Sequence, residues 1–180
     1  MCNALGSGVS NHLQTSALNK RYNHVQCISS WEYQAMTPTS EHPSTSILLI
    51  DASQNQRAYW AAQLKRCSAE YEIIEAPDSE SGLALFRSRR IDCVVLELSL
   101  PDQGGFKTLV ELVPIASRPQ IAVIVHTLIT HRGVWELAKQ SGAYTCLAKK
   151  FTSGEDLDKA IQRAVAFVGQ MPKEDRYQSI

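Results

Sequence analysis

From residue 47 onward the chain alternates between short apolar runs and longer stretches with helical periodicity. The apolar runs are 47–51, 71–76, 91–98, 120–127 and 144–149. Each run is followed by a segment whose apolar side chains recur at the spacing of an amphipathic helix. The pattern therefore predicts five strands, each followed by a helix.

Helix boundaries are indicated by residues that satisfy free backbone groups. Ser53 with Gln56, and Thr152 with Glu155, match the capping box at a helix start. Gly142 suits the end of the fourth helix, because glycine readily adopts the left-handed conformation found there. The fourth helix, residues 132–142, is also predicted to bury one face. That face contains Val134, Leu137, Ala138 and Ser141.

The strands are nearly continuous apolar runs, which is typical of a parallel sheet covered by helices on both faces. Right-handed crossovers then give a doubly wound α/β fold with a five-stranded parallel sheet. In such folds ligands bind at the carboxyl ends of the strands. Four polar residues end different strands, namely Asp51, Glu97, Thr127 and Lys149. Together they form the candidate site.

The chain divides into three parts, residues 1–45, 46–170 and 171–180. The first 46 residues contain 19 Ser, Thr, Asn or Gln and only four charged residues, so we predict a mostly irregular N-terminal extension. Met36 is a candidate translation start. Because the ten residues after Gln170 are too few for an output domain, we expect a single-domain protein with a short C-terminal tail.

The amino-acid composition limits the classes of partner and compartment that we expect for this protein. Lys and Arg together number 18, as do Asp and Glu, so the charge balance gives no case for nucleic acid or an anionic membrane. No apolar run reaches the roughly 20 residues that span a bilayer. The first residues lack the basic and apolar regions of a secretory signal, so we do not expect one, and the five cysteines include no C-x-x-C pair. We expect a reduced, cytoplasmic protein without a disulfide or zinc framework.

Five stretches in residues 46–170 resemble the receiver domain of two-component response regulators, the CheY-like family. They are "ILLIDAS", "VVLELSLPDQGG", "IVHT", "SGAY" and "LAKKF". The resemblance implies the flavodoxin-like strand order 2-1-3-4-5 and a role in phosphorelay signalling. It also implies that Glu97 stands at the phosphoacceptor position and Asp51 in the acidic pocket. Thr127 and Lys149 take the phosphate-contact positions, and Cys146 the switch position.

The sequence departs from the family pattern in the acidic pocket. Glu97 replaces the acceptor aspartate and places its carboxylate about one methylene further out, so we do not expect a good phosphoacceptor. Ala52 stands where the family has a direct metal ligand. Since Mg²⁺ prefers carboxylates and water in octahedral array, we expect weak or no metal binding and no cofactor.

Two further departures lie around strand 5. Lys150 replaces the family's proline, which puts its cis peptide in doubt. Cys146 replaces the switching Tyr or Phe, although Tyr144 lies two residues earlier and is a candidate for partial substitution. Thr127 and Lys149 are retained, so we expect Lys149 to pair with Glu97 or to bridge Glu97 and Asp51.

Three functions fit these residues. The leading one is a non-enzymatic, phosphorylation-independent pseudo-receiver that binds a histidine kinase or a downstream effector. The expected binding surface is formed by the fourth helix, the fifth strand and the fifth helix, and it includes Trp135 and Lys139. The second is a phosphorelay receiver with residual phosphotransfer. The third is a small flavodoxin-like enzyme, although "DASQNQ" after strand 1 has no glycine for a phosphate loop. Outside the site, we expect His126 to be packed and Asp102 to stabilise a turn.

Overall fold

The computed structural model describes residues 44–102 and 104–170. The strands are β1 (Ser46–Ile50), β2 (Glu72–Ala76), β3 (Cys93–Leu96), β4 (Ala122–Thr127) and β5 (Thr145–Ala148). The helices are α1 (Gln54–Cys67), α2 (Ser79–Ser88), α3 (Gly105–Leu112), α4 (Arg132–Gln140), the 3-10 turn η2 (Lys149–Phe151) and α5 (Gly154–Gly169). The predictions for residues 1–43 and for the tail after Gln170 lie outside the described residues.

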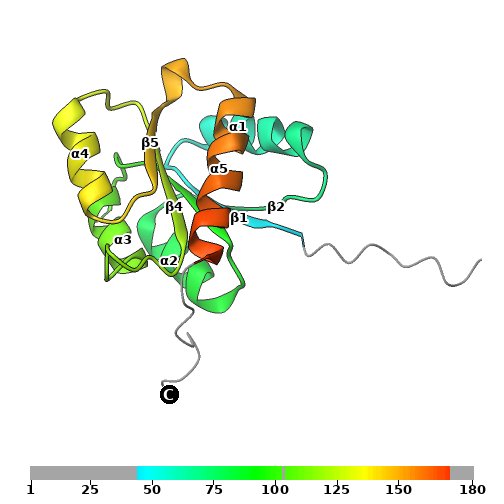
Figure 1. The fold of residues 1–180 in the computed structure, drawn as a ribbon. Coiled ribbons are helices and arrows are strands. Elements are labelled where there is room, and N and C mark those ends of the chain that lie inside the picture. Colours follow the sequence, from blue (N-terminus) through cyan, green and yellow to red (C-terminus); the bar gives the residue numbers. More distant parts are fainter. Residues whose placement is uncertain (1–43, 103, 171–180) are drawn as a thin grey trace, which may run out of the picture. The chain divides into compact units, whose positions relative to one another are not determined.

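All strand pairs are parallel, and the sheet order is β2-β1-β3-β4-β5. At the carboxyl end of the sheet, Ile50 of β1 is in register with Ala76 on one side and Leu96 on the other. The predicted doubly wound fold and its strand order 2-1-3-4-5 are confirmed (Figure 1).

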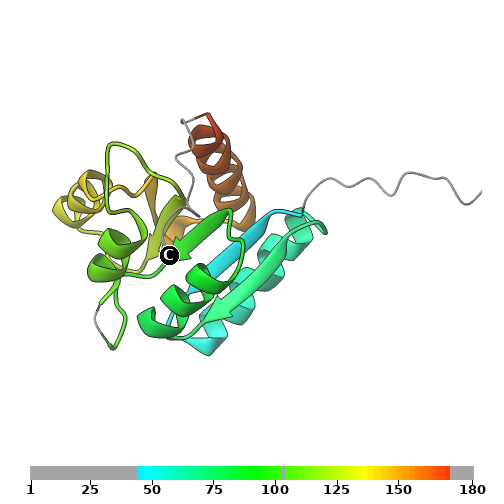
Figure 2. The same cartoon turned by 90° about the horizontal axis from the view of Figure 1, so that it is seen from below.

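Two hydrophobic clusters lie on opposite faces of this sheet. Because side chains alternate along a strand, Leu48 and Ile50 join one cluster while Ile47 and Leu49 join the other. Helices α2, α3 and α4 cover the first face, and α1 and α5 cover the second (Figures 1 and 2). Both faces being covered explains the continuous apolar strands.

Helix α1 begins as predicted, with half of the capping box. The hydroxyl of Ser53 accepts the backbone N–H of Gln56 at 3.4 Å. The Gln56 side chain instead accepts the indole N–H of Trp60 at 3.2 Å. The amide therefore fixes the buried Trp60 on the inner face of α1.

The predicted capping box of α5 is wrong by one residue. Ser153 is the N-cap, and its partner is Asp156: the Ser153 hydroxyl accepts from the Asp156 backbone, and the Asp156 carboxylate accepts from the Ser153 backbone. Thr152 cannot play this part because its hydroxyl donates to the carbonyl of Ala148 at 2.8 Å. The helix therefore begins at Gly154, next to the predicted cap.

The predicted buried face of α4 is also wrong in part. Ala138 is buried, but Leu137 is 52% exposed. Val134 packs against the core as predicted, but the other packed side chain is Trp135 rather than Leu137. Both Val134 and Trp135 are half-buried, so the helix is rotated toward Trp135. The hydrogen bond of the Trp135 indole to the carbonyl of Ile129 accounts for this rotation. Trp135 is thus less accessible than the sequence suggested.

Candidate functional site

The four predicted strand-end residues meet at the carboxyl edge of the sheet. Asp51 follows β1, Glu97 follows β3, Thr127 ends β4, and Lys149 opens the turn after β5. All four are buried, with exposures of 8%, 5%, 0% and 9%. Buried polar groups are costly unless they are paired, so their partners decide what the site is.

The carboxylate of Glu97 has three different donors. The Thr127 hydroxyl and the backbone N–H of Ser99, at 3.0 Å, both donate to Oε1. The Nζ of Lys149 lies 2.7 Å from Oε2. Both oxygens of the glutamate are therefore occupied by groups from β4, from the turn after β5 and from its own loop.

Lys149 also contacts the carboxylate of Asp51, with which it forms a buried salt bridge. Its ammonium thus bridges Asp51 and Glu97, which is one of the two arrangements expected from the sequence. One buried positive charge faces two buried carboxylates. Such a group is held in place only by good geometry and further hydrogen bonds.

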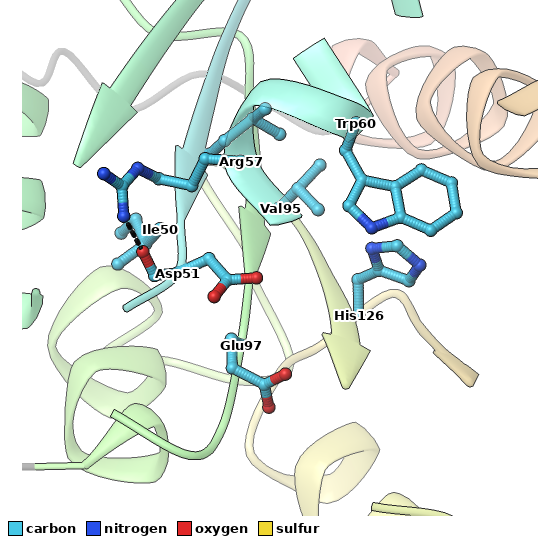
Figure 3. A pocket seen from close by; sticks show the side chains of 8 residues that line it. Ile50, Asp51, Arg57, Trp60, Val95, Glu97 and His126 are labelled. Carbon is cyan, nitrogen blue, oxygen red and sulfur yellow. Dashed lines mark hydrogen bonds between the residues drawn. The ribbon is translucent and has the colours of Figure 1, made fainter. Parts of the chain in front are cut away.

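Asp51 is fixed by neighbours that sequence reasoning did not identify. Its Oδ1 accepts the backbone N–H of Ser53 at 2.8 Å. Its backbone carbonyl accepts an Arg57 N–H at 2.5 Å, as the dashed line in Figure 3 marks, and Arg57 Nε lies 3.5 Å from the Glu75 carboxylate. Arg57 lies near the start of α1, six residues after Asp51. This short spacing is the sequence signal from which the contact could have been predicted.

Burial by itself raises the pKa of Glu97, but this effect is outweighed. Hydrogen bonds from Lys149, Thr127 and Ser99, together with the Lys149 charge, lower the pKa of the carboxyl below its usual value. Glu97 is therefore ionised at neutral pH despite its burial, because its donors favour the charged form.

His126 is packed, as predicted, and by strand alternation it faces away from Thr127. It is 2% exposed, and its ring lies edge-on against Trp60, with centroids 4.4 Å apart (Figure 3). Burial, followed by the charge of Lys149, lowers the pKa of this imidazole to about 3. His126 is accordingly neutral and packed under the site.

A small cavity lies between these groups. It is lined by side chains that include Asp51, Arg57, Trp60, Glu97 and His126 (Figure 3), and it has a volume of about 10 Å³. That volume is about enough for one water molecule. The cavity beside the carboxylates is therefore too small for an organic substrate.

The residues present do not fit the family's Mg²⁺ ion. No three His, Cys, Asp or Glu side chains within 44–102 and 104–170 are grouped so that they could hold a metal. Ala52 is exposed and has no side-chain oxygen, while both carboxylates already contact Lys149. Mg²⁺ would have to compete with a buried ammonium for each of them.

The structure separates Cys146 from Tyr144. Cys146 is buried, and burial raises the pKa of its thiol to about 11. Tyr144 precedes β5, is 37% exposed, and packs its ring at 5.5 Å from Phe167 of α5. The suggested partial substitution by Tyr144 is therefore not supported, because its ring packs against α5 whereas Cys146 joins the cluster beneath α4.

Asp102, in the loop after β3, holds the start of α2. Its carboxylate accepts the backbone N–H groups of Ser79 at 2.9 Å and Glu80 at 3.2 Å. A carboxylate is favourable at a helix N-terminus, where free N–H groups point outward. Asp102 therefore ties the loop that follows Glu97 to the first residues of α2.

The class defined by this fold and site agrees with comparisons to known proteins. Residues 47–162 match the family described as the response regulator receiver domain. The chain belongs to this family and is a receiver domain of the two-component signalling type. Among the described residues, no helix has the length and apolar character needed to cross a membrane.

Two curated proteins are similar to parts of this chain. The chain is 33% identical over 97 residues to the transcriptional regulatory protein PdtaR of Mycobacterium tuberculosis, covering 53% of this chain and 45% of PdtaR. It therefore spans less than half of that relative. Protein PilH of Pseudomonas aeruginosa is 27% identical over 120 residues, covering 67% of this chain and 97% of PilH.

Solved structures show the same fold. The response regulator receiver domain protein from Clostridium thermocellum superposes with a TM-score of 0.61 at 27% identity, covering 68% of this chain and 95% of that one. TrrA from Thermotoga maritima, in complex with Mg²⁺ and BeF, has a TM-score of 0.58 at 24% identity, covering 67% and 98%. At this lower identity, the similarity to TrrA shows a shared fold only.

Proposed function

We propose that this chain is an atypical receiver, a pseudo-receiver, whose Glu97 holds the site in one state without phosphorylation. It acts as a protein–protein interaction module in two-component signalling. The observation that carries the proposal is the set of donors on Glu97: Thr127, Lys149 and the backbone of Ser99. In the family resemblance, Thr127 and Lys149 occupy the positions that contact a phosphoryl group.

The physical reason is charge compensation. A carboxylate attacks phosphorus only when nearby cations neutralise the incoming anion. Here the nearest cation, Lys149, already bridges two carboxylates, and the residues do not fit Mg²⁺. Glu97 therefore serves as a built-in negative charge rather than a reacting group.

The proposed partner is a protein, either a histidine kinase or a downstream effector. The proposed binding surface is formed by α4, β5 and α5. Exposed apolar side chains on it include Leu137, Tyr144 and Phe167, and Glu136 and Lys139 form an exposed pair 4.0 Å apart. Apolar groups with a charged rim are typical of protein interfaces. A nucleic acid is not proposed, because the chain has equal numbers of acidic and basic residues.

The proposal is tested by incubating the full chain with acetyl phosphate and Mg²⁺ and measuring its intact mass promptly. We expect no added phosphoryl group. In parallel, adding beryllofluoride with Mg²⁺ should leave the backbone ¹H–¹⁵N spectrum unchanged. The matched control is the double variant Ala52→Asp with Glu97→Asp, which supplies the missing carboxylate and the shorter acceptor.

A phosphoryl group mapped to Glu97 or Asp51 of the native chain would overturn the proposal in favour of a phosphorelay receiver with residual phosphotransfer. A small enzyme is the weaker alternative, because the cavity at the carboxylates holds about 10 Å³. We accordingly propose a non-enzymatic function.

A further inference from the structure

A hydrogen-bonded path leads from Glu97 to α4 through the loop after β4. The hydroxyl of Thr127 donates to Glu97, and the same oxygen accepts the backbone N–H of Ile129 at 3.2 Å. The carbonyl of Ile129 accepts the indole N–H of Trp135 at 2.7 Å. The backbone of Ile129 is thus held by the site on one side and by α4 on the other.

Helix α4 has few other attachments. Among its nine residues Ala138 alone is fully buried, and its N-cap, His131, makes no side-chain hydrogen bond to the first turn. Leu137 points outward and is 52% exposed. An element with so little buried surface belongs to the less stable part of a fold, so single interactions influence its position.

Trp135 combines two attachments in one side chain. Its half-buried ring packs against the core cluster that contains Cys146, and its indole N–H reaches the loop. The thiol of Cys146 also lies 3.6 Å from the Trp135 carbonyl oxygen. A phenylalanine at this position would keep an apolar ring but lose the donor, which makes the two contributions separable.

We propose that Trp135 is a positioning residue that couples the bonding state of Glu97 and Thr127 to the position of α4. While Thr127 bonds Glu97, the Ile129 backbone is fixed, and Trp135 holds α4 to it. The outward face of α4, with Glu136, Leu137 and Lys139, is then kept in one place. The role of this coupling in signalling rests on the proposed function. The coupling itself can be measured in the isolated protein, without a partner.

The test uses the full chain and two readouts, the indole ¹H–¹⁵N signal of Trp135 and amide hydrogen exchange in α4. Trp135→Phe assigns the indole signal. Thr127→Val, which removes the hydroxyl, should shift that signal and speed exchange in α4 several-fold. Thr127→Ser, which keeps the hydroxyl, should restore both. In the Trp135→Phe background, Thr127→Val should add little to the exchange rate.

The matched control is Thr108→Val in α3, because Thr108 is also a fully buried threonine with a bonded hydroxyl. It should leave the Trp135 signal and α4 exchange as they are. Unchanged signals in Thr127→Val, or additive effects of the two substitutions, would overturn the coupling and leave Trp135 with a packing role only. Phosphorylation of Glu97 in the mass measurement would contradict the proposed function, whereas the coupling is decided by these variants in the unphosphorylated chain.

Discussion

The Nζ of Lys149 lies 2.7 Å from Oε2 of Glu97, and both side chains are more than nine-tenths buried. One residue follows β3 and the other follows β5, so this ion pair joins strands that are not neighbours in the sheet. Removing one partner of a buried ion pair is costly, because it leaves the other charge without compensation. The consequences are measurable.

Replacement of Glu97 by alanine should destabilise the fold by about 1–3 kcal/mol, because the hydroxyl of Thr127 and the N–H of Ser99 lose their acceptor. Lys149 keeps Asp51, which limits the loss. Urea unfolding measures the change. The control is Glu111→Ala, which breaks an exposed pair with Arg87 and should cost only roughly 0–1 kcal/mol. Equal effects of the two substitutions would show that the buried carboxylate is not a fixed part of the structure.

Lys149→Met should be more severe, at about 3–5 kcal/mol near neutral pH, because Asp51 and Glu97 then lie buried without a cation. The loss should shrink as the pH falls, since protonation of one carboxyl removes the repulsion. Lys159→Met is the control, because Lys159 and Glu155 are exposed and 4.0 Å apart. A loss in Lys149→Met that does not change between neutral and acidic pH would contradict the bridging arrangement.

The burial of His126 should make the folded protein less stable as the pH falls. Its pKa is lowered by burial, and secondarily by Lys149, from 6.5 to about 3 in the folded chain. The unfolded chain therefore binds the extra proton first, and stability falls as the pH drops from about 6.5 toward 3. His126→Phe should flatten this part of the pH profile in urea unfolding. A wild-type profile that is equally flat across this range would refute the assignment.

Gly105 lies where a side chain has no room. A Cβ at this position would lie 2.5 Å from the Cα of Leu98 and closer still to the carbonyl oxygen of Glu97. Both distances are shorter than the contacts that Cβ atoms make in proteins. Gly105→Ala should therefore destabilise the protein by about 1–3 kcal/mol and disturb the signals of the loop after Glu97. Gly169→Ala, which meets nothing within 4 Å near the end of α5, should be neutral or stabilising by up to about 1 kcal/mol.

Ala52→Asp tests the lack of fit to Mg²⁺. Ala52 is exposed beside Asp51, so a carboxylate there adds an oxygen ligand of the kind that Mg²⁺ prefers. Calorimetric titration should show weak Mg²⁺ binding by the variant, and stronger binding when Glu97→Asp is added, but none by the native chain. Binding by the native chain equal to that of the double variant would show that Lys149 does not occupy the metal's place.

Much of the fold was predictable because its strands are buried on both faces. Each strand was visible as an apolar run, and each site residue could be recognised as the polar residue that ends a run. The helix details were less predictable. Thr152 and Ser153 both offer a capping hydroxyl, and only the contact of Thr152 with the Ala148 carbonyl decides between them.

The sequence by itself determined the parallel α/β fold and the four residues at its carboxyl edge, because hydrophobic periodicity and strand ends are local properties of the chain. The tertiary structure alone decided that Lys149 bridges both carboxylates, that Arg57 holds Asp51, and that the Trp135 indole reaches Ile129. These contacts join segments whose relative placement depends on packing and side-chain rotamers, and no local pattern specifies them.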